Sequence, residues 1–227
     1  MVSAVRRGAA VLRHPVAHDL LWLADASALR FDGERPAWAT PGCLAQAPVV
    51  VRRASPTDPD LIPVGLRGAT RSQRCAAHVA ASNVLRVQTP EQVLSAWLRR
   101  GLAAHRPWPC LKALGTLAPA LSRGPLPWGV TGGVGYMLAS GVDVLRHDSD
   151  LDLLVRAPSP GDAGALRQAA AMLEGQPARV DVQVQTSAGA FALREWMRTG
   201  GPVLFRTAHG AALCDDPWCP EARTIAA

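Results

Sequence analysis

The segment "HDSDLDLLVRAP", residues 147–158, places three aspartates at alternate positions where an apolar strand begins. Side chains two residues apart along a strand point to the same face, about 6.6 to 7 Å apart. Asp150 and Asp152 therefore share one face, while the leucines beside them point to the other. The segment predicts a strand over 150–157 that is buried on one side and carries paired carboxylates on the other.

The rest of the C-terminal half alternates between strand and helix patterns around this segment. The patterns predict strands at 127–131, 150–157 and 178–186, and helices at 132–141, 159–175 and 190–200. Such alternation indicates an α/β sheet with helices packed on its face, within an overall α/β (α+β) class.

The N-terminal half has a less regular pattern. Strands are predicted at 47–54 and 61–68, and the composition of 69–80 favours a helix. A further helix is predicted to begin at "TPEQ", where Thr89 and Gln92 form a capping box. The Pro- and Gly-rich stretch 113–129 is the candidate boundary. It predicts a smaller N-terminal α+β domain over 1–118 and a second domain over 119–227.

Composition bounds the class of protein. A chain of 227 residues can bury a proper core, and no apolar run approaches the roughly 20 residues of a membrane span. His14, Pro15 and His18 interrupt the N-terminal apolar stretch, so a cytoplasmic location without a membrane is expected. The net charge of +6 favours an anionic partner, but the basic residues are scattered and predict no nucleic-acid-binding block. Five cysteines without a C-x-x-C pair do not predict a zinc site.

A third strand carboxylate, Asp181 in "RVDVQVQT", joins the pair at 150 and 152 if the two strands are neighbours. Two carboxylates about 4 Å apart repel by roughly 4 kcal/mol at an effective dielectric of 20. A proton, an arginine or a divalent cation must offset this repulsion, and oxygen ligands favour Mg²⁺. The alternative is structural: Asp150 ends the strand, and Asp152 pairs with Arg146 or Arg156.

Two other groups of residues suit phosphate binding. The turn "TGGVG", residues 131–135, stands between a predicted strand and helix, where backbone amides of Gly132 and Gly133 can hold a phosphate. It lacks the G-K-[ST] of a P-loop. The segment "GLRGATRSQR" contains three arginines, Arg67, Arg71 and Arg74. They could bind an anion together, or they could form the solvent-exposed face of a helix, and both interpretations are open. For His18 and Asp19 a functional role and simple packing are both open interpretations, and packing is preferred.

Together, "VTGGVGYMLASG", "SDLDLLV" and "VDVQV" resemble the nucleotidyltransferase superfold of polymerase β type. With "RHPVAHDLLWL", "APVVVRRA", "IPVGLRGATRSQRCAA", "TPEQ" and "DPW", the chain resembles the malonate decarboxylase holo-acyl-carrier-protein synthases, which are phosphoribosyl-dephospho-CoA transferases. The usual glycine motif of that family is Gly-Ser, and here Gly132 and Gly133 stand in its place.

The resemblance implies a cytoplasmic enzyme of defined chemistry. It would transfer 2′-(5-triphosphoribosyl)-3′-dephospho-CoA to a serine of the apo acyl-carrier subunit of malonate decarboxylase, forming a phosphodiester and releasing pyrophosphate. Asp150 and Asp152 match the catalytic pair, and we expect them to bind Mg²⁺ or Mn²⁺ with Asp181 as third ligand or base. The C-terminal domain would be catalytic, and the N-terminal domain would recognise substrate or carrier protein. The alternative is a nucleotidyltransferase with another acceptor: a small molecule, a tRNA or another lyase's carrier protein.

Overall fold

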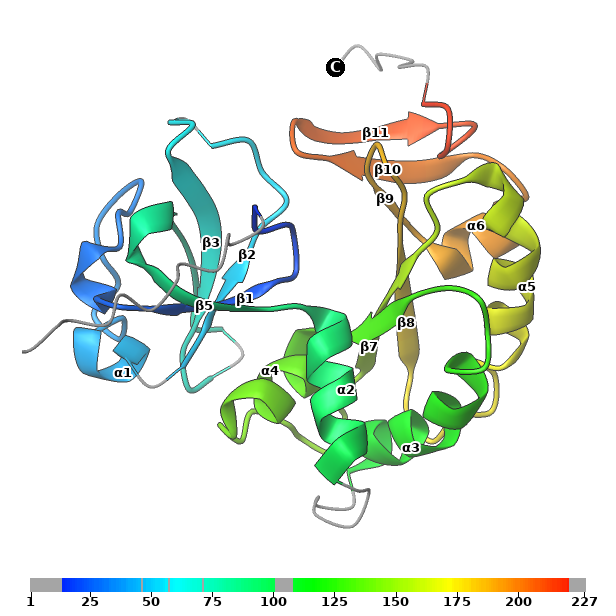
Figure 1. Cartoon of the computed structure of the whole chain (residues 1–227), viewed down its shortest axis with the longest axis horizontal. Helices are drawn as coiled ribbons and strands as arrows, with labels where there is room; N and C mark the ends of the chain where they lie inside the picture. Colours follow the sequence, from blue (N-terminus) through cyan, green and yellow to red (C-terminus); the bar gives the residue numbers. More distant parts are fainter. Residues whose placement is uncertain (1–13, 46, 57, 71, 101–107, 221–227) are drawn as a thin grey trace, which may run out of the picture.

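The chain folds into two β-sheets, and most of its helices pack around the second sheet (Figure 1). The structure is a computed structural model that describes residues 14–45, 47–56, 58–70, 72–100 and 108–220. Mixed helices and two sheets confirm the predicted α+β class. None of the described helices is long and apolar enough to cross a membrane.

The first sheet is antiparallel and has the strand order β4-β3-β2-β1-β5. Its strands are β1 (Leu20–Leu23), β2 (Val49–Val51), β3 (Leu61–Arg67), β4 (Arg74–Ala80) and β5 (Val84–Gln88). One face packs a core of aliphatic side chains with α1 (Pro41–Ala45) and the 3-10 turn Ala26–Ala28, and a second 3-10 turn, Ala81–Asn83, precedes β5. The other face turns toward the second half of the chain (Figure 1).

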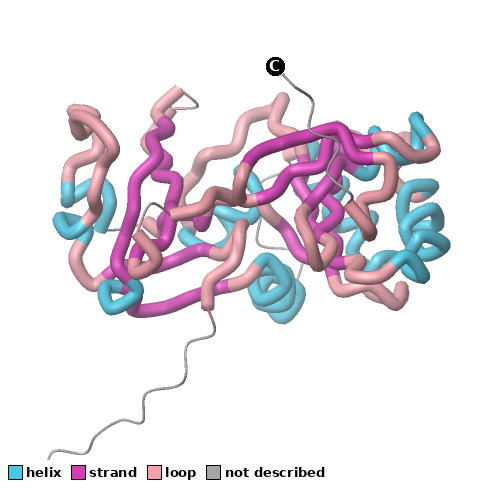
Figure 2. The backbone as a smooth tube through the Cα atoms, turned by 90° about the horizontal axis from the view of Figure 1, so that it is seen from above, coloured by secondary structure: helices cyan, strands magenta, loops and turns pink. Residues whose placement is uncertain are grey.

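The second sheet has the order β11-β10-β9-β8-β7-β6, in which only the β7–β8 pair among the described strands is parallel. Its strands are β6 (Trp128–Val130), β7 (Leu151–Arg156), β8 (Val180–Gln185), β9 (Ala190–Ala192), β10 (Val203–Thr207) and β11 (Gly210–Cys214). One face packs against α3 (Pro109–Leu121), α5 (Ala163–Ala171) and α6 (Leu193–Thr199). In the view from above, helices gather on the outer side of this sheet (Figure 2).

Helices α2 (Pro90–Arg100) and α4 (Gly132–Ser140) lie where the two halves meet (Figure 1). The predicted capping box of α2 is confirmed, because the Thr89 amide donates to the Gln92 side chain and the Gln92 amide donates to Thr89 Oγ1. A Cβ on Gly129 would lie 2.2 Å from the Pro90 carbonyl carbon. Only a glycine therefore lets α2 start directly on strand β6.

The structure corrects the predicted helix over 69–80. Residues 74–80 form strand β4, which pairs with β3 along its whole length, and the 3-10 turn Pro160–Asp162 stands before α5 within the predicted helix of 159–175. The candidate boundary stretch 113–129 begins inside α3, whose buried face packs with the second sheet. The division at 118/119 stays a prediction.

A second contact joins the two halves on the side of the molecule opposite α2 (Figure 1). We call this contact the clasp. The Ser55 amide donates to the Ala208 carbonyl at 2.8 Å, and Ser55 Oγ lies 3.0 Å from His209 Nδ1 in the β10–β11 turn. Arg53 donates to Gln185 Oε1 at 2.6 Å. The first sheet is therefore tied to the second both through the chain at α2 and through these polar contacts.

Candidate functional site

The predicted neighbours β7 and β8 do lie side by side, and their acids meet on one face of the sheet. Asp152 and Asp181 are direct partners in the parallel register. Asp150 immediately precedes β7 and is two residues from Asp152, so it projects toward the same side. On the opposite face, Leu151 and Leu153 are almost fully buried in the core.

The environment of Asp152 is electrostatically unfavourable for an ionised carboxylate. Burial raises the pKa of this carboxyl most, and the negative charges of Asp181 and Asp150 raise it further. Arg74 and Arg67 lower the pKa in part. The face therefore holds excess negative charge that a cation would relieve.

The first glycine of α4 lies directly against this carboxylate. Gly132 has a φ of +59°, and a Cβ there would be 1.8 Å from Asp152 Oδ2. The Thr131 amide donates to the Asp152 backbone carbonyl at 2.9 Å and keeps the turn beside the strand. A helix N-terminus, with its free amides, thus meets the carboxylates across a contact that only glycine permits.

Gly133 is placed differently from Gly132. A Cβ on Gly133 would be 3.3 Å from Leu145 Cδ2 and 3.7 Å from Arg67 Nη1, so a small side chain fits after a slight shift of the leucine. For the nucleotide donor that the sequence resemblance implies, we expect Gly133→Ser to lower the KM by about threefold to tenfold, because a hydroxyl beside Arg67 adds a hydrogen bond of roughly 1 kcal/mol to phosphate. Steady-state kinetics would measure this change, and a higher KM would contradict it.

Two of the three arginines predicted to bind phosphate, Arg67 and Arg74, come from the first sheet. Arg67 and Arg74 are cross-strand partners on β3 and β4, and both line a small polar cleft of about 80 Å³ with Asp150 and Asp152. Arg71 lies outside the described residues. The interpretation of this segment as a solvent-exposed helix face is wrong for Arg74, because Arg74 begins strand β4.

A larger cleft of about 470 Å³ adjoins the small polar cleft and shares Arg74, Gly133 and Asp152 with it. Asp181 lies in it and accepts a hydrogen bond from Arg179 Nε at 3.1 Å. Arg194 and Arg206 also line it. Asp152 thus lines both clefts, whereas Asp150 is in the lining of the small cleft and Asp181 in that of the larger one.

The donor set fits a divalent cation held by two carboxylates. Mg²⁺ usually binds through one or two carboxylates and completes its coordination with substrate phosphates and water, and Asp150 and Asp152 face one polar cleft. In the part of the chain that the structure describes, no three His, Cys, Asp or Glu side chains are grouped closely enough to hold a metal ion. Asp181 as a third ligand or base stays a prediction.

His18 lies at the site, although packing is the preferred interpretation of this residue from the sequence. It lines the larger cleft from the first half of the chain and is the described non-glycine residue with a positive φ, +76°. Burial and the positive charge of Arg53, with a smaller contribution from Arg156, lower its pKa to about 4 against an opposing hydrogen bond with Gln183. Strained backbone of this kind concentrates at functional sites, but no local motif marks it in the sequence.

Comparison with known proteins covers almost the whole chain. Two family models match: the phosphoribosyl-dephospho-CoA transferase MdcG N-terminal domain over residues 16–90, and the corresponding C-terminal domain over residues 97–217. A phosphoribosyl-dephospho-CoA transferase of Pseudomonas putida (strain GB-1) is 44% identical, with 92% of this chain and 98% of that protein covered.

Proteins of the same name from other bacteria are equally similar. The one from Azotobacter vinelandii is 46% identical over 90% of this chain and 94% of its own length, and one from Klebsiella pneumoniae is 44% identical over 91% and 98%. No solved structure is significantly similar to the chain.

Proposed function

Because the chain belongs to the phosphoribosyl-dephospho-CoA transferase family, we propose that it attaches 2′-(5-triphosphoribosyl)-3′-dephospho-CoA to its acceptor. The acceptor is a serine of the apo acyl-carrier subunit of malonate decarboxylase. The serine oxygen forms a bond to the α-phosphorus of the donor, the bond to the β-phosphate oxygen breaks, and pyrophosphate leaves. The serine proton passes to a base at the site, and the product is a phosphodiester.

The observation that carries the proposal is the register of Asp152 and Asp181 beside the start of α4. Asp150 and Asp152 would hold Mg²⁺ or Mn²⁺, which supplies charge neutralisation at the transferring and leaving phosphates. Arg67 and Arg74 reach the same cleft and bind phosphate oxygens. The amides at the start of α4 add donors to the same group.

The roles of Asp181 and the arginine-lined cleft follow from their position. Asp181 is beside Asp152 but faces the larger cleft, so it can accept the proton of a hydroxyl that arrives from that side. The acceptor then enters through the larger cleft and reaches the phosphate beside Asp152, which lines both clefts. Arg194 and Arg206 give this approach a positive potential.

Intact-mass measurement of the acceptor tests the proposal. The purified carrier subunit is incubated with the enzyme, the donor and Mg²⁺, and its mass is expected to rise by that of the donor minus pyrophosphate. A carrier subunit whose target serine is replaced by alanine should stay unmodified. Pyrophosphate release with a tRNA, a small molecule or another lyase's carrier protein, but not with this subunit, would transfer the proposal to that acceptor.

A further inference from the structure

The inner face of the first sheet carries a row of small and aliphatic residues that crosses neighbouring strands. Leu20 pairs with Val50, Val50 pairs with Gly65, and Gly65 pairs with Ala76. Directly opposed residues on neighbouring strands point to the same face. The small Gly65 and Ala76 make this row shallow at its centre, and a Cβ on Gly65 would meet only ordinary contacts, the nearest at 3.6 Å from Arg52 Cγ.

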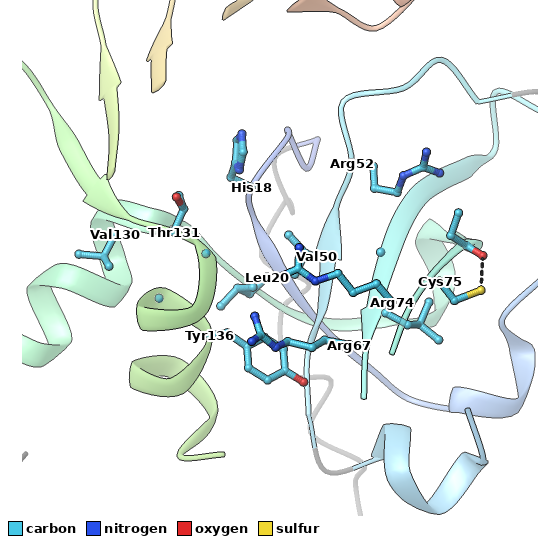
Figure 3. A pocket seen from close by; sticks show the side chains of 15 residues that line it. His18, Leu20, Val50, Arg52, Arg67, Arg74, Cys75, Val130, Thr131 and Tyr136 are labelled. Carbon is cyan, nitrogen blue, oxygen red and sulfur yellow. Dashed lines mark hydrogen bonds between the residues drawn. The ribbon is translucent and has the colours of Figure 1, made fainter. Parts of the chain in front are cut away.

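Helix α4 and strand β6 form the facing wall, and a cavity of about 460 Å³ lies between wall and row (Figure 3). We call it the inter-sheet cavity. Tyr136 and Gly135 line it from α4, and Val130 lines it from β6. Its volume is within the range of small-molecule sites, which are mostly apolar with a few placed polar groups.

Positive charge surrounds the apolar row. Arg67 and Arg74 lie two residues beyond Gly65 and Ala76 on the same face of their strands, and Arg52 lies two residues beyond Val50. The guanidinium of Arg67 lies over the Tyr136 ring at 5.8 Å from its centroid. In Figure 3 the side chains of Arg67 and Arg74 extend from the first sheet toward α4. The cavity therefore suits a ligand with an apolar planar part and an anionic part.

The inter-sheet cavity adjoins the carboxylates. It shares Thr131 and Gly132 with the larger cleft, and Arg67 and Arg74 with the small polar cleft. A second apolar cavity of about 310 Å³, between α3 and α5, shares no lining residue with either cleft. A ligand in the inter-sheet cavity can thus extend into the catalytic clefts without leaving the protein.

We propose that the inter-sheet cavity binds the adenosine end of the nucleotide donor, with the base on the Leu20–Val50–Gly65–Ala76 row. This inference rests on the proposed function, because one ribose separates the adenosine of that donor from the phosphate that reacts. The base therefore has to lie next to the carboxylates, and the 5′-diphosphate of the dephospho-CoA part falls within reach of Arg52. The cavity would thereby select a CoA-type nucleotide among triphosphates.

Filling the cavity tests the inference directly. The probe is 3′-dephospho-CoA, which lacks the reacting triphosphate, and calorimetry measures its binding to the enzyme alone. We expect Gly65→Leu to weaken binding by about tenfold or more, since the new side chain occupies the space of the base. Gly65→Ala should weaken the binding of dephospho-CoA less than Gly65→Leu does. Gly42→Leu makes the same change at an exposed position of α1 with open space around it, and this variant should bind dephospho-CoA as tightly as the unaltered protein does.

Ala76→Leu fills the same space from β4 and serves if Gly65→Leu does not fold, as judged by circular dichroism. In transfer assays, Gly65→Leu and Ala76→Leu should both raise the KM for the donor more than they lower kcat. The inference would be overturned if dephospho-CoA does not bind to the unaltered protein. It would also be overturned if Gly65→Leu and Ala76→Leu both fold and bind dephospho-CoA as tightly as the unaltered protein does. Either result counts against the cavity even if the carrier subunit is modified. If Gly65→Leu or Ala76→Leu weakens the binding of dephospho-CoA but the unaltered enzyme does not modify the carrier subunit, the proposed role of the cavity is supported and the proposed acceptor is refuted.

Discussion

Asp152→Asn is expected to abolish transfer and to raise the melting temperature at neutral pH. The amide keeps the size of the side chain but removes the charge that would hold the cation. A loss of about a thousandfold in kcat corresponds to roughly 4 kcal/mol of transition-state stabilisation, a magnitude typical of metal-assisted chemistry. Intact-mass kinetics of the carrier subunit would measure the loss.

The gain in stability follows from the raised pKa of Asp152. A carboxyl whose pKa is higher in the folded than in the unfolded protein stabilises the fold below the unfolded value, near 3.9, and loses that contribution as pH rises through the folded value. At neutral pH the unaltered protein has lost this stabilising contribution, because Asp152 is then charged in its partly buried position. The Asp152→Asn variant has no charge to bury there and is therefore more stable. About 1 kcal/mol would raise the melting temperature by roughly 2 to 4 °C in a protein of this size.

Thermal melts in metal-free buffer at several pH values would check this second effect. The difference between variant and unaltered protein should shrink as pH falls toward 4. Asp60→Asn, the same change at an exposed loop position, should alter neither turnover nor the melting temperature. Full turnover by Asp152→Asn, or a lower melting temperature at pH 7, would refute the assignment of this carboxylate.

Gly132→Ala is expected to reduce kcat by about a hundredfold or more, comparable with the loss of one preorganised transition-state donor. The new methyl group would lie 1.8 Å from Asp152 Oδ2, and the φ of +59° already disfavours any side chain. Either the carboxylate or the start of α4 must move, and both separate the phosphate-binding amides from the acids. Kinetics with saturating donor would isolate the effect on kcat.

Gly141→Ala provides a matched control for the backbone strain. Gly141 has a φ of +77° at the end of the same helix, but a Cβ there meets nothing within 4 Å. We expect it to lose about 1 kcal/mol of folding stability, as alanine does in this conformation, while transfer continues. If both variants lose transfer equally, strain rather than collision with Asp152 is responsible.

Local patterns in the sequence were sufficient for much of the C-terminal half. Alternating residues gave β7 and β8, and the capping box gave the start of α2, because these signals lie within a few neighbouring positions. Strand β4 could not be found in this way. Its alanines favour a helix locally, but pairing with β3 along seven residues decides its conformation.

The same limit applies to the site. The pairing of Asp152 with Asp181 could be expected once both strands were recognised, because consecutive α/β strands are usually neighbours. The meeting of Arg67 with Arg74 depends on the register of β3 and β4, which neither segment specifies alone. The conformation of His18 arises from distant contacts, among them its amide's hydrogen bond to the Val51 carbonyl.

The clasp formed by Ser55, Ala208 and His209 connects the two halves a second time, so the chain connection at α2 and the clasp together form a closed ring. A hinge at α2 alone cannot spread the two halves, since the ring would first have to break at its weaker, solvent-exposed junction. Such junctions open locally at far lower cost than the global unfolding of the protein. On the proposed function, local opening at this one junction would release a bulky modified carrier and leave both cores intact.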